Sequence, residues 1–324
     1  MNAATQSVTI AIPTYNRERW LKETLESLAD HRHSVPEVEI MVVDNQSTDG
    51  TAAMTNAFIA RVEPQPGTTW RYLLETKQGA SHARNRSVRE ARGSIIVFLD
   101  DDVLLQPGWL DALLEPWKLS PEADIGAVGG EVVPVFPEGC PDWLNGWMSP
   151  LHLRETAGPL EPKQMPMSAN LAVLKEVYEE VGGMRGDLGR QGDKLLAGEE
   201  SEMLKRIRCA GWEIWYAPEA VVEHQFPLAR LNCAYTWRYS RESAQSRVIE
   251  MVHASGLSWG KRFGYCVSRL ICNVIQMILL LVIIPLLRLF GKGGKANKAM
   301  VRLARSAGYI RQTAWELPGL LTGG

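Results

Sequence analysis

Alternating apolar and polar stretches divide the first 130 residues into predicted strands and helices. Short apolar runs predict strands, and apolar residues spaced three and four apart predict helices. The predicted strands cover residues 8–12, 39–43, 71–74 and 95–99, and the predicted helices cover residues 18–28, 79–91 and 110–117. Strands that alternate with helices in this way favour a mostly parallel sheet with helices on both faces.

The pattern after residue 124 is less regular. It predicts two short strands on either side of Gly129-Gly130, a helix that begins near Asn170, and a helix that begins at Glu199. The predicted strands are 125–128, 131–136, 214–216 and 220–223, and the predicted helices are 171–181, 199–210 and 231–254. Residues 134–166 are rich in proline, glycine and tryptophan and predict a long loop region, which in a compact domain is commonly functional.

The apolar run 95–99 ends in three adjacent aspartates, Asp100, Asp101 and Asp102. Like charges at the end of a buried strand repel one another, and they are costly to remove from water unless a cation compensates them. Ligands of open α/β sheets collect at the carboxyl ends of the strands. The cluster therefore predicts a divalent metal with oxygen ligands and a phosphate as its partner. The alternative is an acidic turn in water.

Two other predicted strands end in residues that suit a nucleobase at the same edge. Residues 13–16 follow the first strand and include Pro13 and Tyr15, and the second strand ends in Asp44. We expect an aromatic ring here to stack on the base and Asp44 to accept from a ring N–H. The alternative for Asp44 is a turn or helix-capping aspartate, because residues 47–50 are a good turn sequence.

The overall composition is ordinary for a globular protein, but the charge is unevenly distributed. The chain has 324 residues, of which 45% are hydrophobic and 22% charged. Residues 257–324 carry a charge of +9, which leaves −11 for residues 1–256. This division predicts an acidic catalytic body and a tail that meets an anionic membrane surface, and no nucleic-acid partner is expected. Five scattered cysteines and a polar N-terminus without a basic, apolar leader favour a reducing, cytosolic compartment.

Six segments, in order between about residues 8 and 225, resemble family 2 glycosyltransferases, which have the GT-A fold. They are Ile12-Pro13-Thr14-Tyr15-Asn16, Val43-Asp44-Asn45, Gly79-Ala80-Ser81-His82-Ala83-Arg84-Asn85, Phe98-Leu99-Asp100-Asp101-Asp102, Gly198-Glu199-Glu200 and Pro218-Glu219-Ala220-Val221-Val222-Glu223-His224. The resemblance implies a Rossmann-like sheet with flanking helices in residues 1–256, with a nucleotide-binding half (1–130) and an acceptor half (131–256). It also implies transfer of a sugar from a nucleotide-diphosphate sugar to an acceptor hydroxyl, with inversion at the anomeric carbon.

The resemblance assigns the metal site. The family's Asp-x-Asp motif falls on Asp100 and Asp102. By analogy Asp102 is a direct ligand of Mn²⁺ or Mg²⁺, and Asp100 and Asp101 face the nucleotide or the metal's surroundings. Such a metal stabilises the negative charge that develops on the leaving nucleoside diphosphate. His224 is implied as a second metal or diphosphate contact; the alternative is a surface or capping histidine.

The family's catalytic base corresponds to Glu200. The family pattern is Gly-Glu-Asp, and this chain has Gly198-Glu199-Glu200, so the base is one methylene longer than usual. A carboxylate at a helix start can accept the proton of the attacking hydroxyl. Glu199 is the second choice and otherwise a sugar contact. The alternative for both is an ordinary acidic first turn, which the helix dipole favours.

Several side chains are expected to position the substrates. Arg84 is expected near the phosphates or ribose, with a solvated helix face as its alternative. Asn170 is expected either to contact the donor sugar or to cap the helix that follows it. Trp109, Trp143 and Trp147 form either a sugar-stacking platform or ordinary packing. Residues 188–192 suit a mobile loop that closes over the donor.

The tail contains an apolar run, residues 270–287, that is about long enough to span a bilayer. A single span with a cytoplasmic catalytic body would place the more basic flank outside, against the positive-inside tendency. We therefore expect a re-entrant or interfacial segment with both ends cytoplasmic. A basic amphipathic helix on anionic lipid is expected to follow it at residues 298–314. The alternative for that helix is a buried core or oligomer helix.

Together these features predict a metal-dependent, inverting glycosyltransferase at the cytoplasmic face of the membrane. We expect it to act in cell-surface or exopolysaccharide synthesis on a glycan or lipid-linked acceptor. Two alternatives remain, a nucleotidyltransferase and a non-catalytic scaffold that binds nucleotide sugars. The first would normally carry a basic, glycine-rich loop after the first strand, where this chain has Pro13-Thr14-Tyr15-Asn16. A glycoside hydrolase is disfavoured because the sequence offers no obvious pair of cleft acids.

Overall fold

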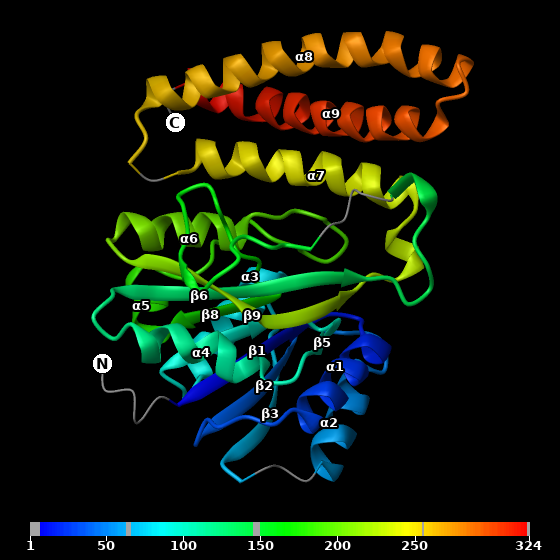
Figure 1. Ribbon diagram of the computed structural model, residues 1–324. Coiled ribbons are helices and arrows are strands. Elements are labelled where there is room, and N and C mark those ends of the chain that lie inside the picture. Colours follow the sequence, from blue (N-terminus) through cyan, green and yellow to red (C-terminus); the bar gives the residue numbers. More distant parts are fainter. Residues whose placement is uncertain (1–6, 63–65, 145–149, 255, 323–324) are drawn as a thin grey trace. The chain divides into compact units, whose positions relative to one another are not determined.

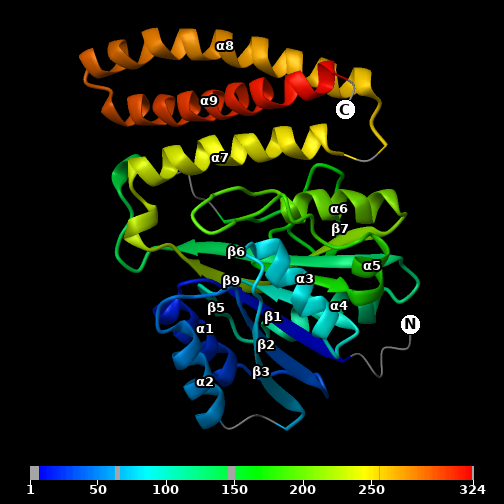
Figure 2. The ribbon, with the colours of Figure 1, turned by 180° about the vertical axis from the view of Figure 1, so that it is seen from behind.

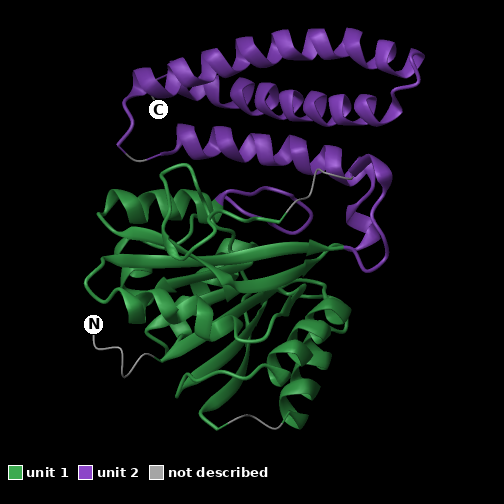
Figure 3. Ribbon diagram, viewed as in Figure 1, with its two compact units in different colours: residues 1–135, 149–186, 199–226 green, residues 136–148, 187–198, 227–324 purple. Residues whose placement is uncertain are grey.

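The computed structural model of the chain describes residues 7–62, 66–144, 150–254 and 256–322. The chain separates into two compact units (Figure 3). Unit 1 comprises residues 1–135, 149–186 and 199–226, and unit 2 comprises residues 136–148, 187–198 and 227–324. Each unit is therefore assembled from segments that are distant in sequence.

The described part of unit 1 contains one nine-stranded mixed sheet with the order β3-β2-β1-β4-β8-β6-β9-β5, and β7 pairs with β9 (Figure 1). The four N-terminal strands of this order are parallel: β1 (Val8–Thr14), β2 (Val38–Asp44), β3 (Thr68–Leu74) and β4 (Ile95–Leu99). The remaining strands add both antiparallel and parallel pairs: β5 (Val103–Leu105), β6 (Ile125–Val135), β7 (Gly158–Pro159), β8 (Asn170–Leu174) and β9 (Glu213–Gln225).

Helices cover both faces of this sheet because its strands are apolar on both sides. Ile40 and Val42 of β2 pack in the main core with α1 and α2, whereas Met41 and Val43 between them pack against Ala83 of α3. Successive strand residues point to opposite faces, so α3 lies on the face opposite α1 and α2. The helices of unit 1 are α1 (Glu18–Asp30), α2 (Thr51–Arg61), α3 (Ala80–Glu90), α4 (Trp109–Leu119), α5 (Lys175–Glu180) and α6 (Glu199–Cys209). The predicted α/β fold is confirmed.

Three predictions of local structure in unit 1 were wrong. Residues 214–216 and 220–223, predicted as two strands, belong to the single strand β9. β6 is one continuous strand, because Gly129 and Gly130 provide space rather than a break: an added Cβ would lie 2.1 Å from Pro166 and 2.2 Å from the Asn170 amide nitrogen. Asn170 begins β8, a fully buried strand between β4 and β6, and the helix starts only at Lys175. A short apolar run fits a buried strand as well as a helix, and the sheet determines which forms.

Unit 2 is built mainly from three long helices, α7 (Cys233–Val252), α8 (Trp259–Leu289) and α9 (Gly293–Leu321). Two short 3-10 helices, η2 (Asp142–Leu144) and η3 (Leu228–Arg230), belong to the same unit. α9 packs along both α7 and α8, and the views from front and back agree on this (Figures 1 and 2). Residues 298–314, predicted to form a helix on the lipid surface, belong to α9, which packs against α7 and α8. This packing agrees with the alternative prediction of a core helix.

α8 is long and apolar enough to cross a membrane, and among the described residues it alone meets that description. It continues through Pro285 without a break. Only 17% of its most apolar window is buried, and Ile275, Leu279 and Val282 are among its exposed apolar side chains. The residues that do pack inside unit 2, such as Leu280 and Ile284, contact α9. Most of the exposed large apolar side chains of the tail thus lie on α8.

Candidate active site

Strand pairing brings the Asp triplet beside His224. β4 ends at Leu99, the aspartates form the turn that follows, and β5 begins at Val103. β5 pairs antiparallel with β9, so that Val103 lies opposite His224. The backbone N–H of Gln225 donates to the carbonyl oxygen of Asp102 at 2.8 Å. The two segments predicted to share a metal are therefore held together by main-chain hydrogen bonds.

Asp100, Asp102 and His224 form one cluster. His224 Nε2 lies 3.2 Å from Asp102 Oδ1 and 3.7 Å from Asp100 Oδ2. Asp102 and His224 are buried, and the ring of His224 packs on Phe226 with 4.5 Å between centroids. Although burial lowers the pKa of His224, the charges of Asp102 and Asp100 raise it above its ordinary value.

This cluster fits a divalent cation. One ligand atom from each of the three residues lies within 4.8 Å of the others. Nδ1 of His224 is buried without a hydrogen-bond partner among the described residues, so Nε2 is the nitrogen directed at the carboxylates. Carboxylate oxygens suit Mg²⁺ and Mn²⁺, and an imidazole nitrogen suits transition metals. The two carboxylates favour a positive charge between them, and this also raises the pKa of His224.

Arg84 connects the Asp cluster to the start of α6. Its Nη2 lies 3.0 Å from Asp100 Oδ1, and its Nη1 lies 2.9 Å from Glu199 Oε1. Arg84 and Glu199 are 5% and 6% exposed, so this ion pair is buried. The predicted alternative for Arg84, a solvated helix face, is excluded by this burial. Its guanidinium is instead placed between two carboxylates at the edge of the sheet.

Glu200, the predicted base, lies in surroundings that disfavour its charged form. Burial raises its pKa to about 8, and repulsion from Glu199 and Asp100 acts in the same direction, while Arg84 partly offsets it. Since Asp100 contributes to this shift, the candidate base and the Asp cluster share one electrostatic environment. A carboxylate with a raised pKa is a stronger base than an ordinary one.

The predicted base-binding edge lies at the ends of β1 and β2. Asp44 is 1% exposed, and both of its carboxylate oxygens accept hydrogen bonds, from the Ser47 N–H at 2.8 Å and the Tyr72 hydroxyl at 2.9 Å. Burial and the Asp44 carboxylate raise the pKa of Tyr72 to about 12, so Tyr72 keeps its proton and donates. Asp44 therefore stabilises the turn at residue 47, as the alternative prediction for it stated. Pro13 and Tyr15 are partly exposed at the same edge.

Asn170 and Trp109 hold the centre of the sheet. Asn170 Oδ1 accepts from Trp109 Nε1 at 2.8 Å, and its Nδ2 donates to the carbonyl oxygens of Glu131 and Ala220 at 2.9 and 2.7 Å. The predicted helix cap is wrong, since Asn170 begins a strand. Contact with a donor sugar would require one of these bonds to be exchanged. Trp109 is fully buried, which excludes it from a sugar-stacking platform.

The other two tryptophans of that prediction have different outcomes. Trp143 lies in η2 and is partly exposed, and Trp147 lies outside the described residues. The stacking platform thus stays a prediction for Trp143 alone.

Two contacts of the acidic residues were missed from the sequence. Arg17 Nη2 lies 3.5 Å from Asp102 Oδ2, and Thr14 Oγ1 donates to Asp101 Oδ2 at 2.7 Å. Burial raises the pKa of Asp101 to about 7, and the neighbouring Asp102 acts in the same direction against Arg17. Thr14 ends β1 and Arg17 lies three residues beyond it, so their position at the end of the first strand was the available signal.

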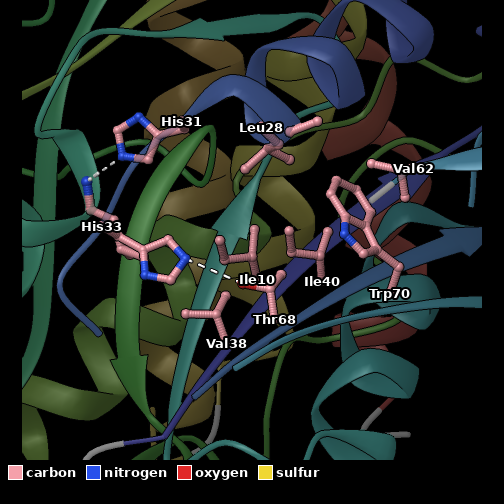
Figure 4. A pocket seen from close by; sticks show the side chains of 11 residues that line it. Ile10, Leu28, His31, His33, Val38, Ile40, Val62, Thr68 and Trp70 are labelled. Atoms are coloured by element: carbon pink, nitrogen blue, oxygen red, sulfur yellow. Dashed lines mark hydrogen bonds between the residues drawn. The ribbon is translucent and has the colours of Figure 1, made fainter. Parts of the chain in front are cut away.

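A small hollow lies on the side of the sheet that faces α1 (Figure 4). His31 and His33 border it, and strand residues such as Ile10 and Ile40 line its floor. Its volume is about 10 Å³, which accommodates no more than one water molecule. His31 Nε2 accepts from the Leu110 N–H at 3.5 Å. These histidines therefore belong to the packing of the domain and not to a substrate site.

Comparison with known proteins identifies the family of this chain. The sequence model described as "Glycosyl transferase family 2" matches residues 9–182. A glucosyl-dolichyl phosphate glucuronosyltransferase of Haloferax volcanii is 26% identical over 259 residues, covering 76% of this chain and 78% of the relative. The succinoglycan biosynthesis protein ExoM of Rhizobium meliloti is 25% identical over 276 residues, covering 82% and 84%. The relatives therefore act in glycan and polysaccharide biosynthesis.

Solved structures share the fold. A mannosyltransferase of Pyrobaculum calidifontis, in complex with GDP-Man and Mn²⁺, matches with a TM-score of 0.56 at 20% identity, covering 99% of this chain and 74% of that one. TarS of S. aureus, residues 1–349 in complex with UDP-GlcNAc, matches with a TM-score of 0.52 at 17% identity, covering 79% and 69%. Because the family match extends over more than half of the chain, this protein belongs to glycosyltransferase family 2 and is an enzyme of that family.

Proposed function

We propose that this enzyme transfers a sugar from a nucleotide-diphosphate sugar to an acceptor hydroxyl, with a divalent metal at Asp100, Asp102 and His224 and Glu200 as the base. The observation that supports it most strongly is the convergence of two carboxylates and one imidazole, from Asp100, Asp102 and His224, with ligand atoms within 4.8 Å of one another. The mannosyltransferase of similar fold binds GDP-Man and Mn²⁺.

The metal site would hold the donor. Asp102 and His224 supply an oxygen and a nitrogen ligand, and Asp100 supplies a second oxygen or faces the ribose. When bound, Mn²⁺ or Mg²⁺ supplies positive charge for the diphosphate that leaves. Pro13 and Tyr15 border the nucleoside, Asp44 orients that edge through its hydrogen bonds, and Asp101 is fixed by Thr14.

Glu200 would take the proton of the acceptor hydroxyl. Its raised pKa is consistent with a base, and attack on the face opposite the leaving group would invert the anomeric carbon. Glu199 is paired with Arg84 and so is the weaker candidate for the base. Its second oxygen, Oε2, is buried without a hydrogen-bond partner within the described residues, which leaves an acceptor available for a sugar hydroxyl.

We further propose that the acceptor is lipid-linked and that α8 lies in the cytoplasmic face of the membrane. The exposed apolar face of α8 and the basic residues around it support this. One relative is named for action on a glucosyl-dolichyl phosphate. A helix that lies in the interface keeps both of its ends on one side of the membrane, as the charge distribution favours.

A binding panel followed by a transfer assay tests the proposal. The full chain in mild detergent is heated with UDP, GDP, dTDP or CDP, each with and without Mn²⁺, for the wild type and Asp102→Asn. We expect one nucleotide to raise the unfolding temperature only with metal, and the variant to lose this effect. Transfer from the corresponding nucleotide sugar to a polyprenyl-phosphate glycan should then be lost in Glu200→Gln. Nucleotide binding that does not depend on the metal would refute the metal role, and full activity of Glu200→Gln would refute the base.

A further inference from the structure

Arg17 lies beside the Asp cluster with its hydrogen-bond donors unused. It is the N-cap residue of α1, and its Nη2 lies 3.5 Å from Asp102 Oδ2. Only 14% of its side chain is exposed. Since N–H···O hydrogen bonds are about 2.7–3.2 Å long, this ion pair is too long to be one. Within the described residues the Arg17 guanidinium makes no hydrogen bond, so its N–H groups are available to a ligand.

Arg84, on the other side of the cluster, is already hydrogen-bonded. Its Nη1 and Nη2 donate to Glu199 and Asp100 at 2.9 and 3.0 Å, and Arg84 is 5% exposed. A phosphate could take these two donors only by breaking a buried ion pair, which is costly. Arg17 has no such hydrogen bonds to lose, so it is better placed than Arg84 to bind an added anion.

Hydrogen bonds between two loops fix the backbone at Arg17. Asn16 has a φ of +53°, a left-handed conformation that asparagine tolerates. Its N–H donates to Ser47 Oγ at 2.9 Å, and its Oδ1 accepts from the Thr48 N–H at 2.7 Å. The Arg17 N–H donates to Thr51 Oγ1 at 3.0 Å. The backbone is therefore held at the ends of β1 and β2, whereas the guanidinium is held by its ion pair alone.

Asp102 is shared between Arg17 and the proposed metal site. Its Oδ1 faces His224 Nε2 at 3.2 Å, and its Oδ2 faces Arg17. A divalent cation at this carboxylate would add positive charge beside the guanidinium, and like charges repel strongly in a buried site. An anion bound at the same place removes this repulsion. The donor of the proposed reaction brings such an anion, its diphosphate, and a guanidinium can bind phosphate oxygens through two parallel hydrogen bonds.

We propose that Arg17 binds the diphosphate of the donor and releases Asp102 when it does so. The inference rests on the proposed function. In the transfer, the bond between the anomeric carbon and the β-phosphate oxygen breaks, the acceptor oxygen bonds to that carbon, and its proton goes to Glu200. The β-phosphate oxygen keeps the electron pair, and Arg17 stabilises the negative charge that collects there.

The test measures two affinities of the full chain in mild detergent by titration calorimetry. One is for Mn²⁺ alone, and the other is for UDP, GDP, dTDP or CDP in excess Mn²⁺. In Arg17→Gln we expect the Kd for the nucleotide that the wild type binds to rise about ten- to a hundredfold. The Kd for Mn²⁺ alone should stay the same or fall, because a competing positive charge at Asp102 is lost. A residue that only held Asp102 in place would weaken both when removed.

Arg19→Gln is the matched control. The Arg19 side chain is 63% exposed and pairs with Glu23 at 3.3 Å. Its replacement removes the same charge two residues further on, so both affinities should stay within about twofold of the wild type. Arg17→Lys keeps the charge without the paired donors, so its Kd for nucleotide should lie between those of the wild type and Arg17→Gln. It provides the comparison if Arg17→Gln does not fold.

The outcomes separate this inference from the proposed function. A nucleotide Kd that is unchanged in the Arg17 variants, or a loss of affinity for both Mn²⁺ and nucleotide, would overturn the role of Arg17 alone. A wild type that binds none of the four nucleotides in the presence of Mn²⁺ would overturn the proposed function, and the role of Arg17 with it.

Discussion

Replacing Glu200 by glutamine should stabilise the protein at alkaline pH while removing its activity. Glutamine has nearly the same shape but no charge. Burial and the nearby Glu199 raise the pKa of Glu200 to about 8, from an ordinary value of 4.5. The folded protein therefore disfavours the charged form of Glu200, and this penalty disappears in Glu200→Gln.

The sign and size of the effect follow from linkage. A carboxyl group whose pKa is raised by folding is favourable below pH 4.5 and loses that contribution as the pH rises through about 8. The difference between about 8 and 4.5, at about 1.4 kcal/mol for each tenfold change, corresponds to about 5 kcal/mol at high pH. For a unit of this size, that should raise the unfolding temperature of Glu200→Gln above the wild type by about 10 °C or more.

The assay is thermal unfolding of the full chain at pH 5 and pH 9, in a chelating buffer that keeps the site free of metal. We expect Glu200→Gln to unfold near the wild-type temperature at pH 5 and well above it at pH 9. Glu202→Gln is the control on the same helix: Glu202 pairs with Arg206 at 2.6 Å, so its loss should not stabilise the protein at either pH. An equal difference between Glu200→Gln and wild type at both pH values would refute the reasoning.

Three further outcomes follow from the structure. His224→Ala should lose most of the Mn²⁺-dependent rise in unfolding temperature, measured without nucleotide. Burial opposes ionisation of Glu39, but hydrogen bonds from Arg92, Arg71 and Thr9 lower its pKa, so Glu39→Gln should cost about 1–3 kcal/mol at pH 7 in denaturant titrations, and this difference should shrink as the pH falls below the ordinary value of 4.5 and through the lowered pKa. Gly308→Ala should destabilise unit 2 by about 1–3 kcal/mol, whereas Gly319→Ala on the same helix, where a Cβ meets nothing within 4 Å, should be neutral or slightly stabilising by the same thermal assay.

The part of the site that is contiguous in sequence could be predicted from it. An apolar strand followed by Asp100, Asp101 and Asp102 identifies both the element and its chemistry in one stretch of eight residues. The acidic start of α6 could be predicted equally well, since Gly198 precedes two glutamates. The partners of these acids were harder to foresee. That Arg84 bridges Asp100 and Glu199 depends on how α3 and α6 pack, which no local pattern contains.

The errors have a common physical cause. Residues 170–174 form a strand between β4 and β6, and all of their side chains are buried. Pairing with these two strands overrides the helical spacing of residues 171–181. Gly129 and Gly130 suggested a turn, although their role is to admit Pro166 and Asn170. Likewise, the basic helix after residue 293 packs on α7, a partner that its own sequence does not reveal.

The pairing of β5 with β9 has a consequence for how the enzyme folds during its synthesis. Asp100 and Asp102 leave the ribosome long before His224 is made, so a growing chain carries these acids and their partners Arg84 and Arg17 without the histidine. The cluster is completed only when β9, the last strand of unit 1, docks. The metal proposed for this cluster would bind the finished fold and not its precursors. The supply of metal would then govern how much enzyme a cell accumulates, in addition to how fast each molecule works.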